Sequence, residues 1–228
     1  MASQAPSGMK RFYLFLGLVA VVGVGALAYL TLRRTTVSIP ANVAVVAADT
    51  AGFRGYLLGS DSATIEVTEY ADYQCPACAT FETVQFPDVK DRLIQTGRVR
   101  WRYRDFPING HLNARIAAHT AACANDQGRF WEMHRFLYEG QPDWEFAGNP
   151  MGDFESYARS AQLDMSAFGA CMKSAKYAGR IEASAQEGLK VGVNSTPTFL
   201  IGGRLYPGVM PYDAMRKLVD SLAGKPKS

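Results

Sequence analysis

Residues 69–78 read EYADYQCPAC, so two cysteines, Cys75 and Cys78, close this stretch with two residues between them. Such a CxxC spacing is found in disulfide redox centres and in metal sites, and it also arises by chance. A proline directly after the first cysteine suits redox use. The residues on either side of the two thiols have to decide between these chemistries.

The residues before the cysteines predict a β-strand. Residues 63–70 read ATIEVTEY, which is rich in β-branched side chains and alternates in polarity. Ile65, Val67 and Glu69 then share one face of the strand. Two interpretations of Glu69 stay open: its side chain turns outward at the strand end, or it is a buried carboxylate beneath the cysteines.

The residues after the cysteines predict a helix. Cys75 takes the N-cap position and Pro76 the first helical position, where a missing N–H costs nothing. The helix dipole and the unpaired N–H groups there stabilise a thiolate on Cys75, while Cys78, one turn further in, is more shielded. One acidic, exposed thiol beside one shielded thiol is what disulfide exchange requires. We expect Pro87 to kink this helix and Gly97 to end it.

A second strand is expected at residues 98–105, where apolar side chains alternate with arginines. Strand, helix and strand together predict a parallel βαβ unit. Near the C-terminus, residues 193–201 predict a turn and a strand that begins after Pro197. Gly202-Gly203 predicts a hairpin turn into a short strand at 204–206, and a closing helix follows at 212–222.

Helical patterns fill the middle of the chain, from about residue 110 to 190, and predict a helical domain inserted between the sheet elements. Cys123 and Cys171 both lie in this insert. In an oxidising compartment they can form a structural disulfide; otherwise they are two buried thiols that pack as small hydrophobic side chains. The three histidines show no spacing typical of a metal site, and we expect all three to be ordinary: His111, His119 and His134.

The N-terminal region predicts a membrane segment. Residues 1–11 are polar and end in two basic residues, and residues 12–32 contain no charge and are long enough to span a bilayer as a helix. We expect an uncleaved signal anchor, because the apolar run continues past a possible cleavage site at 26–28. Residues 33–54 are expected to be a linker. A short strand is possible within the lead-in at residues 35–60, either at 43–46 or at 56–58.

A membrane anchor or a signal sequence would both carry the rest of the chain out of the cytoplasm, where thiols meet an oxidising environment. The composition adds exclusions. A net charge of +3 is too small to indicate a nucleic-acid-binding protein, and four cysteines among 228 residues are too few for a scaffold built on disulfides. A hydrophobic core therefore has to stabilise the fold.

Taken together, three motifs resemble the DsbA-like branch of the thioredoxin superfamily: EYADYQCPAC at 69–78, FWEMH at 130–134 and VNSTPTF at 193–199. The resemblance implies an α/β, thioredoxin-like fold over residues 55–228, with a large inserted helical domain and an N-terminal transmembrane helix before it. The whole match is more specific than any of the motifs alone.

The resemblance also implies residue roles. Cys75 would be the nucleophile, Cys78 the resolving thiol and Glu69 the family's buried acid. Pro197 would be the family's cis-proline, which faces the cysteines, and Thr196 before it would bind substrate peptide together with Pro76 and Ala77. The chain departs from the best-known strong oxidants of the branch at Ala77, where those proteins carry histidine. Without the imidazole, Cys75 lacks one stabiliser of its thiolate.

The expected function is that of a thiol–disulfide oxidoreductase on the extracytoplasmic, periplasmic side of a bacterial cell membrane. As a dithiol oxidase it would pass its Cys75–Cys78 disulfide to secreted proteins as a monomer, without a cofactor or metal, and a membrane partner would reoxidise it. Three alternatives are a reductase or isomerase on the same fold, a metal-binding or copper-delivery module that uses the CxxC, and a non-catalytic binding domain.

Overall fold

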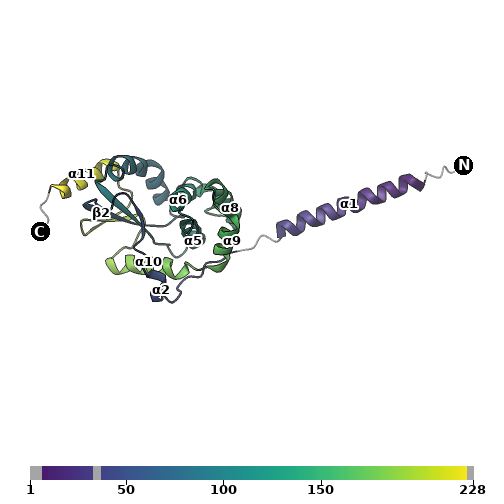
Figure 1. Cartoon of the computed structure of the whole chain (residues 1–228), viewed down its shortest axis with the longest axis horizontal. Helices are drawn as coiled ribbons and strands as arrows, with labels where there is room; N and C mark the ends of the chain where they lie inside the picture. The colour runs from purple at the N-terminus through teal and green to yellow at the C-terminus, as the bar shows by residue number, and fades with distance from the viewer. Residues whose placement is uncertain (1–6, 33–36, 225–228) are drawn as a thin grey trace. The chain divides into compact units, whose positions relative to one another are not determined.

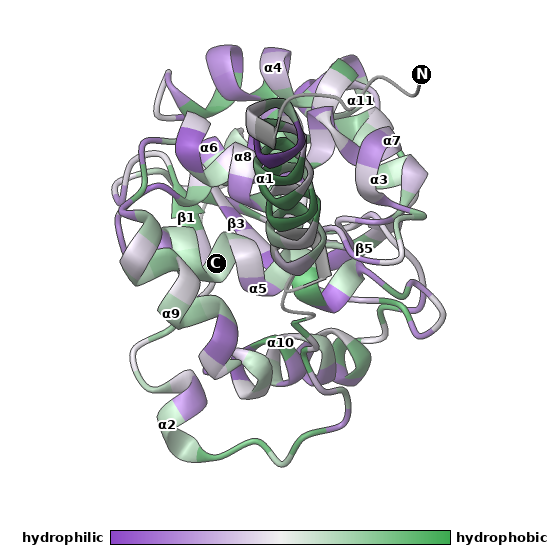
Figure 2. Cartoon of the chain, turned by 90° about the vertical axis from the view of Figure 1, so that its right-hand side faces the viewer, coloured by the Kyte–Doolittle hydropathy of each residue, from purple (hydrophilic) through white to green (hydrophobic). Residues whose placement is uncertain are grey.

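The computed structural model describes residues 7–32 and 37–224, which belong to two units, Met1–Thr36 and Val37–Ser228. The first unit holds one long helix, α1 (Ser7–Leu32). Figure 2 shows apolar residues along most of its length. Among the described residues, Gly8–Tyr29 is the one segment that is long and apolar enough to cross a membrane, a property that signal sequences share.

The second unit contains one sheet and several helices. Its strands are β1 (Tyr56–Leu58), β2 (Ile65–Ala71), β3 (Val99–Asp105), β4 (Thr198–Ile201) and β5 (Arg204–Pro207). Its helical segments are α2 (Ala47–Thr50), α3 (Pro76–Thr80), η1 (Phe81–Gln85), α4 (Phe86–Val89), η2 (Lys90–Ile94), α5 (Ala114–Asn125), α6 (Phe130–Glu139), α7 (Gln141–Trp144), α8 (Met151–Ser160), α9 (Met165–Ser174), α10 (Ala178–Val191) and α11 (Tyr212–Ala223).

The sheet has the order β1-β3-β2-β4-β5. The central strands β2 and β3 run parallel, which confirms the predicted βαβ unit, and the other pairs are antiparallel. Gly202 and Gly203 connect β4 to β5 with positive φ angles of 56° and 78°, a turn conformation that glycine adopts without strain. The mixed sheet between helices has the expected thioredoxin-like architecture.

Helices cover both faces of the sheet (Figure 1). One face packs against the helical run from α3 to η2 and against α11, through a core that includes Val67, Phe81, Trp101 and Met215. The other face packs against α10, where Tyr70 and Phe106 meet Ala185. Ile65 and Val67 therefore lie on the first face, and the alternation along β2 places Glu69 on the same face, as predicted.

The helical run after Cys75 changes its hydrogen-bonding pattern on both sides of Pro87. Two π-helical segments, η1 and η2, flank the short α4 in which Pro87 lies. Proline has no N–H to donate to the preceding turn, and local widening of the helix is one way to accommodate that loss. Gly97 follows the run with a φ of 75° and precedes β3, so the predicted end is at the right place.

The inserted helices α5 to α9 pack around a core that includes Ala121, Met133 and Phe154, and this core also contains Cys78 and the sheet residue Tyr103. Within this insert a disulfide joins Cys123 on α5 to Cys171 on α9, with their Cα atoms 5.8 Å apart. Both residues are buried. Of the two predicted states of this pair, a disulfide or two free buried thiols, the structure contains the disulfide.

The linker prediction is wrong for residues 37–54. Ile39 is buried, Val37, Val43 and Phe53 pack against the core of the insert, and the N–H of Asn42 donates to the carboxylate of Glu182 on α10. Residues 33–36 lie outside the described part of the chain. The strand alternative at 56–58 is correct and the one at 43–46 is not. The apolar side chains of residues 37–54 bury surface against the domain. The composition of this stretch is typical of a loop and therefore did not predict that burial.

Candidate active site

Cys75 and Cys78 both have free thiols at the start of α3. Cys75 is the N-cap residue and Pro76 the first residue of the helix, as predicted. Cys75 is 7% exposed, Cys78 is fully buried, and Pro76 and Ala77 between them are exposed and half-buried. The thiol that the helix N-terminus favours as a thiolate is thus also the one that solvent can reach.

The loop before β4 lies against the first cysteine. The peptide bond between Thr196 and Pro197 is cis, and the thiol of Cys75 donates a hydrogen bond to the carbonyl oxygen of Thr196 at 3.4 Å. Two segments far apart in the sequence, the CxxC and the Thr196-Pro197 loop, therefore meet at one place. The hydroxyl of Thr196 has no hydrogen-bond partner among the described residues.

The surroundings separate the acidities of the two thiols. A hydrogen bond from Cys78 lowers the pKa of Cys75 to about 5, and Thr196 and the backbone N–H groups of Ala77 and Cys78 add to this effect against the opposing effect of burial. Burial raises the pKa of Cys78 well above its ordinary value, and the bond to Cys75 and the nearby Glu69 raise it further. At neutral pH the site holds a thiolate beside a protonated thiol.

Polar side chains hold the loop before Cys75 in place. The buried carboxylate of Asp72 accepts hydrogen bonds from the N–H of Gln74 at 2.7 Å and of Ile108 at 2.8 Å, and it contacts His111. The side-chain amide of Gln141 donates to the carbonyl of Cys75 at 3.2 Å. These bonds join three segments around the CxxC, so the thiols are held in a fixed position.

Glu69 is fully buried, which excludes the interpretation that its side chain turns outward. Neither of its carboxyl oxygens has a hydrogen-bond partner among the described residues. Burial raises its pKa well above the ordinary value, and a neighbouring carboxyl, Glu82, raises it further. The raised pKa favours the protonated form of Glu69, which can donate a proton, and the charge of the ionised form acts on Cys78.

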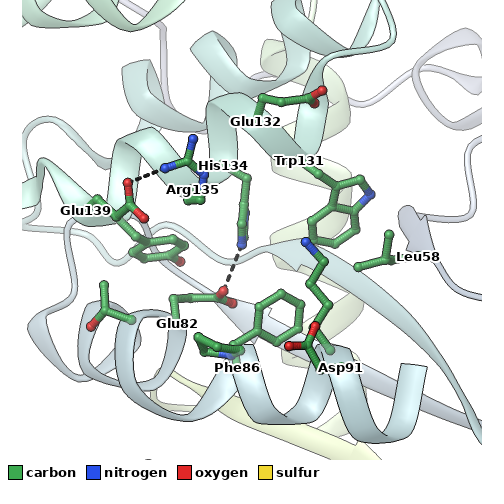
Figure 3. Close-up of a pocket in the computed structure, with 13 residues that line it drawn as sticks. Leu58, Glu82, Phe86, Asp91, Trp131, Glu132, His134, Arg135 and Glu139 are labelled. Atoms are coloured by element: carbon green, nitrogen blue, oxygen red, sulfur yellow. Dashed lines mark hydrogen bonds and ion pairs between the residues drawn. The ribbon is translucent and has the colours of Figure 1, made fainter. Parts of the chain in front are cut away.

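Sequence reasoning missed Glu82 and His134. Glu82 on η1 is buried, and its Oε2 lies 3.1 Å from Nε2 of His134 on α6, whose Nδ1 lies 2.9 Å from the hydroxyl of Tyr73. Both line a pocket of about 590 Å³, and Figure 3 shows them facing each other. Among the described residues, His134 belongs to no metal-like cluster, which agrees with the expectation for this histidine. Glu82 had a usable signal, since it lies four residues after Cys78 on the same helix face. His134 lies in the FWEMH motif, but its contacts come from other segments and do not follow from that motif.

His119, unlike the other two histidines, has a cysteine at helical spacing. It lies four residues before Cys123, and its Nε2 is 3.5 Å from the sulfur of Cys123. Among the described residues, His119, Cys123 and Cys171 are the one group whose ligand atoms all lie within 4.8 Å of one another. The sulfur atoms of this group are joined in a disulfide and are not thiolates, the form in which cysteine ligates metals.

A family model described as thioredoxin matches residues 54–221, which is more than half of the chain. The chain is 33% identical over 169 residues to a Na⁺/H⁺ antiporter NhaA of Salinispora tropica; the match covers 74% of this chain and about a quarter (24%) of the antiporter. It is also 26% identical over 173 residues to disulfide bond formation protein D of Bacillus subtilis, with 74% of this chain and 78% of that protein covered.

Solved structures agree with the fold. BdbD of Bacillus subtilis in its oxidised form has a TM-score of 0.67 and 23% identity, and the similarity covers 82% of this chain and 96% of BdbD. Alpha-DsbA1 of Wolbachia pipientis has a TM-score of 0.68 and 22% identity, over 75% of this chain and 92% of that one. The chain belongs to the thioredoxin family, and its fold is that of the DsbA-like members.

Proposed function

We propose that this protein is a thiol–disulfide oxidoreductase and that Cys75 and Cys78 are its redox centre. The observation that carries this proposal is the pairing of a thiol of low pKa that is 7% exposed with a fully buried thiol of high pKa, beside the loop of Thr196. The thiolate on Cys75 would attack or leave first, and Cys78 would resolve the mixed disulfide. The name of the Bacillus subtilis relative, a disulfide bond formation protein, supports the same reading.

The proposed direction is oxidation. The Cys75–Cys78 disulfide would pass to cysteine pairs of secreted or periplasmic proteins, and a membrane partner would reoxidise the dithiol. A low pKa of Cys75 supports this direction, because a stable thiolate favours the reduced enzyme and makes its disulfide a stronger oxidant. Pro76, Ala77, Thr196 and Pro197 surround Cys75, and we assign substrate binding to them. Glu69 would move the proton of Cys78.

A membrane anchor at residues 12–32 completes the proposal, with residues 1–11 in the cytoplasm and the catalytic domain on the periplasmic side. The length and the apolar composition of α1 support it. Alkaline extraction of membranes from expressing cells should leave the full chain in the membrane pellet; release of a shorter, soluble form would favour a cleaved signal sequence.

The direct test of the activity uses the oxidised protein and a reduced synthetic peptide that contains two cysteines. One equivalent of protein should convert one equivalent of peptide to its disulfide, and mass spectrometry should find Cys75 and Cys78 reduced afterwards. Reductase activity is the second candidate, because Ala77 offers no imidazole to the thiolate. Fast reduction of insulin disulfides together with slow peptide oxidation would favour that candidate.

A further inference from the structure

The segment that carries Cys75 has no positive side chain of its own. Residues 69–80 contain no lysine, arginine or histidine, and Ala77 between the two cysteines is uncharged. Hydrogen bonds, with the one from Cys78 first, account for the low pKa of Cys75. A cation beside a thiolate would stabilise it further, since opposite charges favour each other's ionised form. Any such cation at this site has to come from another part of the chain.

His111 lies in a turn that packs against the loop before Cys75. The N–H of Ile108 and Nδ1 of His111 both donate to Oδ2 of Asp72, each at 2.8 Å. The backbone carbonyl of the same Asp72 accepts the N–H of Cys75 at 3.0 Å. One residue therefore bonds to the histidine through its side chain and to the first cysteine through its main chain, and these bonds fix the turn against the loop.

The surroundings of His111 favour its charged form. Its side chain is 29% exposed, while the carboxylate of Asp72 is completely buried. The hydrogen bond to Asp72 raises the pKa of His111 above its ordinary value against the opposing effect of burial, and the charges of Asp72, Cys75 and Glu145 raise it further. The titratable groups that act on the imidazole are thus Asp72 in the loop, Cys75 at the start of α3 and Glu145 after α7, and each is negative when ionised.

The coupling between the charges of His111 and Cys75 acts in both directions. Because the thiolate raises the pKa of the imidazole, the imidazolium has to stabilise the thiolate by the same free energy. This contribution is smaller than that of the hydrogen bonds to the sulfur, which dominate the low pKa of Cys75. In the disulfide form Cys75 carries no charge, so the coupling exists only in the reduced protein.

We propose that His111, held by the buried carboxylate of Asp72, supplies the positive charge that Ala77 does not offer beside Cys75, and that its protonation tunes the oxidising strength of the Cys75–Cys78 pair with pH. His111 acts on the sulfur through its charge, and Asp72 is the residue that positions it. The proposal rests on the function proposed above for Cys75 and Cys78.

The proton balance gives this coupling a measurable sign. Reduction of the disulfide takes up two electrons, here from glutathione, and one proton, which goes to Cys78, so the reduction potential falls by about 30 mV for each pH unit. Since His111 holds its proton more tightly in the reduced protein, reduction takes up a further fraction of a proton while His111 titrates, and the potential falls more steeply there. The disulfide is therefore the stronger oxidant below the pKa of His111, and this added strength is lost as the pH rises through it.

The first experiment needs no substitution. NMR follows the titration of the His111 imidazole in the full-length protein, once oxidised and once reduced. Burial lowers the pKa of His119 and of His134, so both titrate below His111 and can be told apart from it. His111 should bind its proton about threefold more tightly in the reduced protein, as expected for a partly exposed ion pair. Equal affinities in the two forms would overturn the proposal.

Substitutions at His111 test the same coupling from the side of the sulfur. His111→Gln keeps an N–H donor for Asp72 but has no charge. The Cys75 thiol should bind its proton about threefold more tightly in this variant, and the reduction potential at about pH 6 should fall by about 15 mV, the same threefold change for a two-electron couple. At about pH 9, where the wild-type imidazole is neutral, the two proteins should have equal potentials. His111→Lys should restore the potential at about pH 6 and remove the steeper region from its pH dependence.

Arg159→Gln is the matched control, because it removes one positive charge from α8, where the side chain is exposed and paired with Glu155. It should change neither the Cys75 titration nor the potential. Wild-type values in His111→Gln at about pH 6, or a deficit that persists unchanged at about pH 9, would overturn the proposal. Thermal unfolding identifies a variant that misfolds, and the NMR comparison then decides.

The outcome also separates this proposal from the proposed function. If the oxidised wild type does not oxidise the two-cysteine peptide, the proposed function fails. If it does, while His111→Gln keeps the wild-type titration of Cys75, only the role of His111 fails.

Discussion

Cys75 and Cys78 lie three residues apart at the start of a helix with both thiols free, whereas Cys123 and Cys171 are separated by 48 residues and join two helices through a disulfide. All four side chains are buried. Burial therefore does not distinguish the pairs. Apolar side chains of one core surround both pairs. The first pair also meets a helix N-terminus, the loop of Thr196 and the buried acid Glu69, while the second pair has His119 as a polar neighbour.

The comparison teaches that polarity of the surroundings decides what a cysteine pair can do. Groups that stabilise one thiolate and protonate the other make the reduced state of Cys75 and Cys78 accessible. The polar side chain beside the bridge between α5 and α9 is His119, and burial lowers the pKa of its imidazole, which disfavours the charged form that would stabilise a thiolate. The bridge also closes a long loop, which favours the oxidised state. We therefore expect one pair to cycle and the other to stabilise the fold.

The largest expected effect comes from removing the attacking sulfur. Cys75→Ser should abolish peptide oxidation, a loss of at least about 10³-fold, because the Cys75–Cys78 disulfide can no longer form and the remaining thiol, Cys78, is fully buried. Cys78→Ser should keep Cys75, whose thiolate attacks glutathione disulfide and releases one glutathione thiolate; the Cys75–glutathione mixed disulfide should then persist until reductant is added, because no second thiol resolves it. The comparison would break if Cys75→Ser kept its activity, or if replacing Cys123 and Cys171 abolished it instead.

Removing the other pair should change stability and not chemistry. The double variant Cys123→Ala/Cys171→Ala should lose about 4 kcal/mol of unfolding free energy, the chain-entropy estimate for a loop of 48 residues. Urea unfolding measures this loss, and peptide oxidation below the unfolding transition should match the wild type. An unchanged unfolding midpoint would mean that the bridge contributes nothing to the fold.

The pH dependence of the reduced protein sharpens the contrast between the thiols. Hydrogen bonding lowers the pKa of Cys75 to about 5, below that of an unfolded cysteine. The thiolate therefore stabilises the folded protein fully above the unfolded pKa of about 9, and this stabilisation is lost as the pH falls through about 5. The melting temperature of the reduced wild type relative to Cys75→Ser should decline over that window. Thiolate absorbance should titrate with a midpoint near 5; a midpoint near 8.5 would contradict the account.

The smallest expected effect concerns the residue between the two thiols. Ala77→His places an imidazole beside the thiolate and should lower the pKa of Cys75. Each pKa unit is worth about 1.4 kcal/mol, so one unit would raise the reduction potential by about 30 mV. A redox titration against glutathione measures this shift, and Ala77→Gln serves as the uncharged control. A lower reduction potential in Ala77→His than in the wild type would contradict the account, in which a more stable Cys75 thiolate at the helix N-terminus raises the potential.

Local sequence patterns were sufficient for much of this site. The N-cap position of Cys75 follows from Pro76 and the helical spacing after it, and the face of Glu69 follows from the alternation along its strand. Both depend on neighbours in the sequence. The meeting of Cys75 with Thr196 was accessible only through the family resemblance, since a β-strand pairing and a long helical insert bring these residues together.

Two features escaped because they are tertiary. Glu82 and His134 face each other from two helices, and an apolar helix pattern such as FWEMH gives no sign of which residue its histidine will meet. Residues 37–54 have few regular elements, and their burial depends on the shape of the surface that α10 and the insert present. Periodicity predicts which face of an element is buried, but it does not identify the partner.

The reduction potentials of the two pairs, measured together, test the central claim most directly. Glutathione or dithiothreitol redox buffers, alkylation and peptide mass spectrometry can report both pairs in one sample. The account predicts that Cys75–Cys78 titrates above about −270 mV, the value of thioredoxin, while Cys123–Cys171 stays oxidised to below about −300 mV. A potential of Cys75–Cys78 at or below about −270 mV, or joint titration of the two pairs, would contradict it.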